Sequence, residues 1–384
     1  MKNNNKITIY IFIIDFLTNI ITWYIFIFLL NLIYISSNNI LHFALFYILR
    51  LIASTVISFI LSYMADIKGI DKIMKLILFT FFIITILPIS NNDILYNLYF
   101  IYIILIIFES NFTLYNILKY SLVPKVSSNL ERINSVYELS YSILMVIGPF
   151  SALILLRVKD LVPLIALIPS IIFSLIIDRI FIYNTKTHNL SDLNSILRNI
   201  SENRKLIKIF IFYILLANVG SIVNLAIINI SERLPITTSF IAKFSLINTL
   251  LGSGSLISSI VIIKNNSLNS KSVLLSWIIL STYPLVIFLL YYFNFSILLT
   301  YIFLAFSFLN GFFNSILSIF ITSKIQENSK EYIATTFSIL NFLSNIISIL
   351  LLYIEGLFYR YILIILIISS LSLFVSISIH KNLG

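Results

Sequence analysis

Apolar stretches long enough to cross a bilayer fill this chain almost from end to end, and twelve of them can be distinguished. A hydrocarbon core about 30 Å thick needs roughly 20 apolar residues per helix. Apolar residues make up 60% of the chain and charged residues 10%, whereas a soluble domain has about 45–50% and about 25%. The sequence therefore predicts an all-α membrane protein with twelve transmembrane helices.

The expected helices form two sets of six. We place the first set at roughly 7–34, 40–64, 73–91, 94–120, 133–156 and 161–183, and the second at roughly 206–230, 236–263, 272–293, 295–323, 332–354 and 357–380. Between the sets, the polar residues 184–205 include apolar side chains at helical spacing, namely Leu193, Ile196, Leu197 and Ile200. We therefore expect an N-terminal half at 1–183, a linker with a short amphipathic helix at 184–205, and a C-terminal half at 206–384.

Lysine and arginine are distributed unequally between the two sides of the membrane. With the N-terminus taken as cytoplasmic, 19 of the 25 lie on that side, Lys119 among them. Only Arg157, Lys159, Arg233 and Arg360 lie on the other side, and Arg50 and Lys243 lie inside spans. Cytoplasmic loops carry such an excess of positive charge. We therefore expect a multi-pass protein of the cytoplasmic membrane, with both termini and the linker in the cytoplasm. The same loops explain the net charge of +10 without a nucleic-acid partner.

The residues that most catalytic and metal sites need are missing or scattered. The chain has no cysteine, and His42, His188 and His380 are far apart in sequence, at expected helix ends or loops. The sequence has no GxxxxGK[ST] run, so ATP-driven transport would need a partner subunit. The first apolar stretch has no small-residue cleavage site of the kind that ends a signal peptide, and we expect it to remain as a helix. With little chain outside the bilayer, we expect no enzyme activity, no metal site and no cofactor.

The connection after the second expected helix carries a pattern of its own. It reads SYMADIKGIDK from Ser62 to Lys72, and it resembles the GxLaDrxGrk signature between the second and third helices of the major facilitator superfamily. Two halves of six helices are also that superfamily's layout. Asp66, Gly69 and the basic Lys72 match the signature, and glycine suits a tight turn. The resemblance implies a conformational-switch motif, with Asp66 acting where the second helix meets the eleventh.

A second pattern runs from the fourth expected helix into the fifth. It begins with ILKYSLVPKV at Ile117 and continues with Asn134-Ser135 and Gly148-Pro149. It resembles the "PArsAliPxlv…aNs…iGP" stretch of the macrolide- and siderophore-type efflux branch. Gly148-Pro149 stands where the antiporter signature gxxxGPxxGG is expected, but its other glycine positions hold Leu144, Ala152 and Leu153. Proline frees a backbone carbonyl and glycine permits close packing, so the pair predicts a helix kink.

Ionisable side chains inside the expected spans are candidates for substrate and proton sites. They are Asp15 in the first helix, Arg50 in the second, Glu109 in the fourth and Glu138 in the fifth. These four helices line the central cavity in the superfamily that the chain resembles, which implies that Arg50 lies near Asp15 and Glu109. The alternative is that Arg50 and one acid only neutralise each other for packing. Glu138 lies near its cytoplasmic helix end, where a structural cap or interface role also fits.

The resemblance implies a secondary active transporter that works by alternating access. We expect a monomer that exports an amphipathic small molecule in exchange for protons. Transport of a metabolite or siderophore by the same fold is one alternative. A transport-inactive membrane sensor or scaffold is another.

Overall fold

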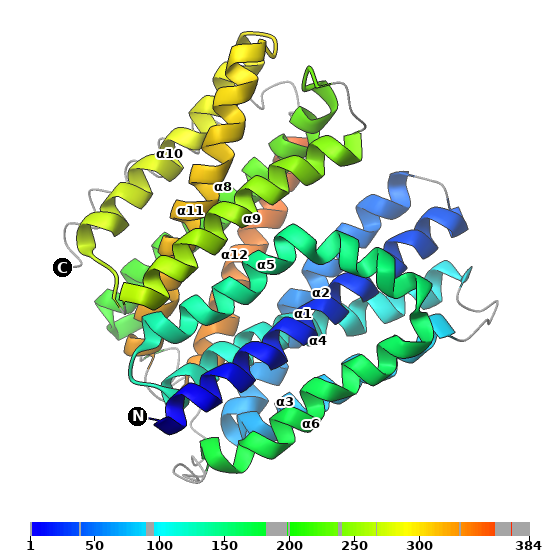
Figure 1. The fold of residues 1–384 in the computed structure, drawn as a ribbon, viewed down its shortest axis with the longest axis vertical. Coiled ribbons are helices and arrows are strands. Elements are labelled where there is room, and N and C mark those ends of the chain that lie inside the picture. Colours follow the sequence, from blue (N-terminus) through cyan, green and yellow to red (C-terminus); the bar gives the residue numbers. More distant parts are fainter. Residues whose placement is uncertain are drawn as a thin grey trace. The chain divides into compact units, whose positions relative to one another are not determined.

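A computed structural model describes residues 2–37, 40–89, 96–181, 198, 200–236, 240–265, 267–329, 332–357 and 370. Within these ranges the chain is almost entirely helical, with eleven α-helices of 17 to 36 residues. They are α1 (Lys2–Ser37), α2 (Ile40–Lys68), α3 (Ile70–Ile86), α4 (Leu98–Val126), α5 (Leu130–Arg157), α6 (Val162–Phe181), α8 (Arg204–Arg233), α9 (Phe240–Asn265), α10 (Ser270–Tyr292), α11 (Ile297–Asn328) and α12 (Ile333–Leu357) (Figure 1).

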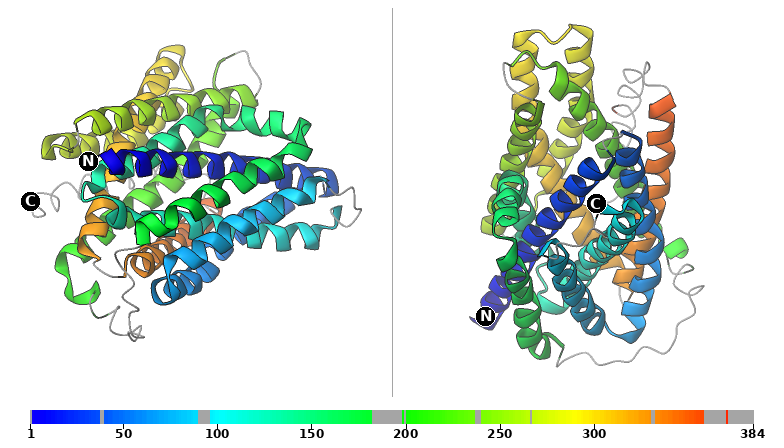
Figure 2. Two further views of the ribbon diagram at one scale, coloured as in Figure 1. Left: turned by 60° about the horizontal axis from the view of Figure 1, so that its bottom comes forward. Right: turned by 90° about the vertical axis from the view of Figure 1, so that its right-hand side faces the viewer.

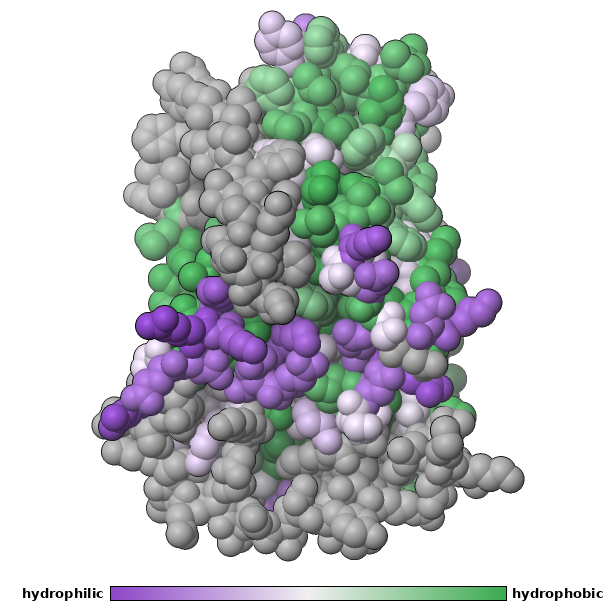
Figure 3. All heavy atoms as spheres, turned by 90° about the vertical axis from the view of Figure 1, so that its left-hand side faces the viewer, coloured by the Kyte–Doolittle hydropathy of each residue, from purple (hydrophilic) through white to green (hydrophobic). Residues whose placement is uncertain are grey.

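Eight helices in the described part of the chain are long and apolar enough to cross a bilayer. Their outward side chains include Leu76, Ile103 and Leu298, which are 57%, 55% and 71% exposed. On the face drawn in Figure 3, apolar side chains cover broad areas and hydrophilic ones gather in a band. Contact with lipid tails explains such exposure. The predicted all-α membrane fold is confirmed, while the twelfth expected helix at 357–380 lies, apart from Leu357 and Ser370, outside the described residues.

The first of two compact units consists of Met1–Ile133, Ile147–Asn199 and Ser329–Phe342. Within it α2 packs along α4, α3 packs along α6, and α1 contacts both α4 and α6 (Figure 1, Figure 2). The ring of Phe81 on α3 meets Phe108 and Tyr115 of α4 edge to face. All three side chains are buried. This aromatic core fixes α3 to the helix that carries Glu109.

The second unit consists of Asn134–Val146, Ile200–Asn328 and Leu343–Gly384. Its closest helix pair is α9 with α11, and glycines explain how near the two backbones come. A Cβ atom added to Gly254 would lie 2.0 Å from the carbonyl oxygen of Phe308, and one added to Gly311 would lie 1.9 Å from that of Leu251. Residues without a side chain are therefore required on both sides of this contact.

Two helices contribute to both units. The α5 residues Asn134–Val146 belong to the second unit and those from Ile147 onward to the first, while α12 passes from the first unit to the second after Phe342. The division into two six-helix halves stays a prediction. Most of the expected amphipathic helix at 184–205 lies outside the described residues.

Candidate functional site

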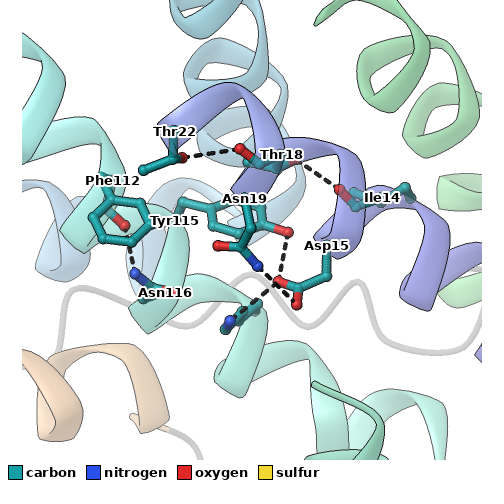
Figure 4. Close-up of polar contacts among 9 residues, drawn as sticks. Ile14, Asp15, Thr18, Asn19, Thr22, Phe112, Tyr115 and Asn116 are labelled. Atoms are coloured by element: carbon teal, nitrogen blue, oxygen red, sulfur yellow. Dashed lines mark hydrogen bonds and ion pairs between the residues drawn. The ribbon is translucent and has the colours of Figure 1, made fainter. Parts of the chain in front are cut away.

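Asp15 lies fully buried on α1 and is held by three donors. Its Oδ1 accepts hydrogen bonds from Nζ of Lys119 and from the hydroxyl of Tyr115, each at 3.0 Å. Its Oδ2 accepts one from Nδ2 of Asn19 at 3.1 Å. Figure 4 shows Asp15 directed from α1 toward Tyr115 on α4. A buried charge needs a partner charge and further hydrogen bonds, and Asp15 has both.

Lys119 is a site residue that the sequence analysis assigned to the cytoplasmic loop charges. The structure places it inside α4, 4% exposed, with its ammonium 3.0 Å from Asp15. The same nitrogen lies 5.7 Å from the ring centroid of Tyr115 and 5.4 Å from that of Tyr120, within the range of a cation–π contact. Its position among Leu118, Leu122 and Val123, with no charged neighbour until Lys125, is the sequence signal for its burial.

Glu109 and Arg50 form a second ion pair in the same unit. Glu109 of α4 is 2% exposed, and its Oε1 lies 2.6 Å from Nε of Arg50 on α2. The Arg50 side chain is 33% exposed, and its guanidinium carbon lies 5.1 Å from the ring centroid of Phe26 on α1. The neighbouring Ser110 donates a hydrogen bond to the carbonyl of Ala53 on α2. This bond fixes α4 against α2 beside the ion pair.

The two buried acids differ in how fully they are satisfied. The Asp15 carboxylate accepts hydrogen bonds at both oxygens. Oε1 of Glu109 has Arg50 as its ionic neighbour but accepts no aligned hydrogen bond from any residue that the structure describes. The sequence predicted that Arg50 lies near both acids. In the structure Arg50 pairs with Glu109, whereas Asp15 pairs with Lys119.

Asp66, at the end of α2, lies at the N-terminus of α12 within the first unit. Its Oδ2 accepts hydrogen bonds from the backbone N–H of Thr335 at 2.8 Å and from the Thr335 hydroxyl at 2.7 Å. The aspartate therefore caps a helix that belongs to a distant part of the sequence. Gly69 has φ +107°, and its N–H donates to the carbonyl of Ala65. Lys72, on the first turn of α3, is exposed.

Glu138 lies in the wall of a cavity of about 200 Å³ in the second unit. Its Oε1 accepts a hydrogen bond from the Ser255 hydroxyl of α9 at 3.2 Å. The hydroxyls of Ser142 and Ser255 are 2.6 Å apart, and Ser142 also donates to the backbone carbonyl of Glu138. Glu138, for which a structural cap or interface role was the alternative, therefore lines a cavity.

A buried amide pair joins α5 to α11 in the same unit. Nδ2 of Asn134 donates to Oγ of Ser323 and to Oε1 of Gln326, each at 2.8 Å. Nε2 of Gln326 donates back to Oδ1 of Asn134 at 3.3 Å. Asn134 belongs to the second sequence motif, but nothing in that motif indicates Gln326 as its partner. The pair fixes the start of α5 to the end of α11.

Comparisons with solved structures identify the fold. The chain is similar to a variant of the fucose:proton symporter FucP of E. coli, with a TM-score of 0.70 over 98% of each chain at 12% sequence identity. It is also similar to a bacterial homologue of the iron transporter ferroportin in an outward-facing state, with a TM-score of 0.70 at 16% identity over 98% of this chain and 99% of that one. The chain has the major facilitator fold.

The same major facilitator fold relates the chain to the human organic anion transporter MFSD10 (TETRAN), with a TM-score of 0.68 at 13% identity over 98% of this chain and 99% of that one. No protein-family model matches the sequence, and no curated protein matches it significantly. The fold class predicted from the sequence is therefore confirmed by structural likeness. Sequence identities of 12% to 16% show the fold alone.

Gly148 has a packing role within the first unit of this major facilitator fold. A Cβ atom added to it would lie 2.8 Å from the indole nitrogen of Trp23 on α1. Any larger residue at this position would displace the Trp23 ring. Pro149 follows in α5, but its side chain lies outside the described residues, and the predicted kink stays a prediction.

Proposed function

We propose that this chain is a secondary active transporter that exports a small amphipathic molecule in exchange for protons. The major facilitator fold supports transport, since three of the structures similar to this one are named as a proton symporter, an organic anion transporter and a homologue of an iron transporter. In this mechanism two parts of the protein move around a central site, which opens to each side of the membrane in turn.

The proposed coupling to protons rests on the ion pair of Glu109 with Arg50. Desolvation disfavours a charged carboxylate, and a guanidinium nearby favours it. These opposing effects change when the surroundings of the pair change, so such an acid can load a proton in one state and release it in another. Arg50 is one-third exposed while Glu109 is buried. A movement of Arg50 would therefore alter the charge balance at Glu109.

Asp15 has a different role in this proposal. Its carboxylate is bound by Lys119, Tyr115 and Asn19, so releasing it would break three interactions at once. It holds α1 to α4 and keeps Glu109 in place. Glu109 carries the proton, and Asp15 is the next candidate if Glu109 fails the test.

The test is proton-driven flux in proteoliposomes made with the full chain. With Glu109→Gln, we expect a pH gradient no longer to concentrate substrate, while exchange of substrate at equilibrium continues. Glu327→Gln is the matched control, because Glu327 also pairs with a base, Lys324, but at an exposed position. If Glu109→Gln still concentrates substrate against a gradient, Glu109 is not the coupling residue.

Proton-coupled uptake is the second candidate for the direction of transport. The observation that favours it is the likeness to a protein named as a fucose:proton symporter. The same vesicles distinguish the two directions. Export by antiport requires that an inward proton gradient drives substrate out, whereas symport requires that it drives substrate in. Neither movement, with any compound of a broad panel, would support the sensor or scaffold alternative.

A further inference from the structure

The cavity beside Glu138 lies wholly within the second unit and is lined by five helices. The wall is formed by residues of α5, α8, α9, α10 and α11. Its polar members are Glu138, Tyr141, Ser255, Tyr283, Asn310 and Asn314. The remaining lining residues are apolar or glycine. A mostly apolar cavity with a few polar groups is the usual form of a small-molecule site.

Glu138 is the one residue with a formal charge in this wall, among the lining residues that the structure describes. The Ser255 hydroxyl donates a hydrogen bond to its Oε1, and this bond orients the carboxylate in the wall. Asn310 and Asn314 stand one helical turn apart on α11, where amide oxygens can accept further hydrogen bonds. A ligand group with positive charge and N–H donors would complement the carboxylate of Glu138 and the amide oxygens of Asn310 and Asn314.

Aromatic side chains extend the same preference. Tyr141 and Tyr283 both belong to the wall, and aromatic rings attract ammonium groups through their π-faces. Tyr283 is fixed in place, since its hydroxyl shares a hydrogen bond with Ser307 at 2.9 Å and its ring stacks on Phe303. A carboxylate together with the fixed ring of Tyr283 selects against anions.

The size of the cavity limits the ligand. Its volume is about 200 Å³, and an engineered apolar cavity of about 150 Å³ is known to bind benzene. The ligand is therefore about one aromatic ring with a short arm. Gly220 contributes to this space, because a Cβ atom added there would have no neighbour within 4 Å among the residues that the structure describes.

We propose that this cavity binds a small amphipathic organic ammonium, with Glu138 as its counter-ion and the apolar wall around its ring. The proposal names the cargo class of the transporter proposed above and rests on that function only for its biological role. Binding itself can be measured on the purified protein.

Calorimetric titration of the full-length protein in detergent at neutral pH tests the charge preference. The probes are benzylamine, the neutral benzyl alcohol and the anionic benzoate, which share one ring and differ in the charge of the arm. We expect benzylamine to bind at least about tenfold more tightly than benzyl alcohol, and benzoate not to bind. Equal affinity for the three probes, or preference for benzoate, would overturn the proposal.

Glu138→Gln tests the counter-ion with nearly the same shape. We expect it to weaken benzylamine binding at least about tenfold and to leave benzyl alcohol unaffected. Glu131→Gln is the matched control, since Glu131 lies on the same helix two turns earlier and outside the cavity wall. Unchanged benzylamine affinity in Glu138→Gln would sink the proposal.

Gly220→Leu tests the place of binding without touching any charge. A Cβ atom at Gly220 would contact none of the described residues within 4 Å, the rest of a leucine side chain would occupy the adjoining cavity, and leucine favours a helix more than glycine does. We therefore expect a folded protein with an unchanged or higher melting temperature that no longer binds benzylamine. Full binding in this variant would place the ligand elsewhere.

Flux measurements keep this proposal separate from the proposed function. If benzylamine binds through Glu138 but no cargo crosses vesicles, the cavity assignment stands and the transport function is wrong. If another cargo is transported while benzylamine does not bind, transport stands and the ammonium assignment is wrong.

Discussion

Nζ of Lys119 on α4 and Oδ1 of Asp15 on α1 lie 3.0 Å apart in the interior of the first unit, although the two residues are 104 positions apart in sequence. The two side chains are 5% and 0% exposed. Neither can turn to water when its partner is removed. This distinguishes the pair from a surface ion pair such as Lys324 with Glu327, whose side chains are 37% and 43% exposed.

Breaking the buried pair on one side should destabilise the protein strongly. We expect Asp15→Asn or Lys119→Met alone to cost about 3–5 kcal/mol, because each leaves a buried charge uncompensated. The double variant should recover most of that loss. Thermal unfolding of the four proteins in detergent measures the coupling. The same double-mutant cycle with Glu327→Gln and Lys324→Met should give a coupling free energy of about 0–1 kcal/mol. An equally small coupling between Asp15 and Lys119 would show that the buried pair does not stabilise the fold.

Asp66→Asn should slow transport several-fold without weakening substrate binding. The variant retains an oxygen that can accept from Thr335 but loses the negative charge at a helix N-terminus, where it stabilises by about 0.3–1 kcal/mol. Initial rates over a range of substrate concentrations separate kcat from KM. Asp71→Asn, in the adjacent turn, is the control and should leave both unchanged. A large rise in KM with normal turnover would move Asp66 into the binding site.

Gly311→Ala should destabilise the second unit. The added Cβ would lie 1.9 Å from the carbonyl oxygen of Leu251, so α9 and α11 must separate, and overpacking of this kind costs about 1–3 kcal/mol. Gly220→Ala is the control, because its Cβ would contact no described residue within 4 Å and the helix gains up to about 1 kcal/mol. Melting temperatures should therefore shift in opposite directions. A loss of similar size at both positions would attribute the effect to helix sequence rather than to packing.

Reporter fusions test the orientation. Fusions after residues 70, 128 and 195 should report the cytoplasm, and those after residues 37, 92 and 234 the outside, because the basic loops are expected on one side. An external signal after residue 195 would contradict the arrangement of six plus six helices.

The features that the sequence predicted well are local ones. That the segments are membrane-spanning helices follows from the length and apolarity of each stretch. Gly69 in the expected turn adopts the positive φ that glycine allows. Asp15 and Glu109 could be singled out because an acid within an apolar stretch is costly. Each of these inferences needs only a few consecutive residues.

The partners of these acids could not be predicted, because they depend on where helices end and how they are rotated. The expected fourth helix ended near residue 120, which put Lys119 among the loop charges. In the structure α4 continues to Val126 with Pro124 inside it, and Lys119 is buried. The pairing of Asn134 with Gln326 joins residues 192 positions apart, and no local pattern relates them.

The hydrogen bond between Asp66 and Thr335 has a consequence for biosynthesis. The two residues are 269 positions apart, and a chain is made and folds from its N-terminus. The cap on α12 therefore forms only after residue 335 has been synthesised, although α2 has long been inserted by then. Asn134–Val146 likewise waits for the later helices of its unit. A chain that ends before residue 333 would lack part of both units. We therefore expect neither unit of such a truncated product to fold completely, so that both become targets for proteolysis.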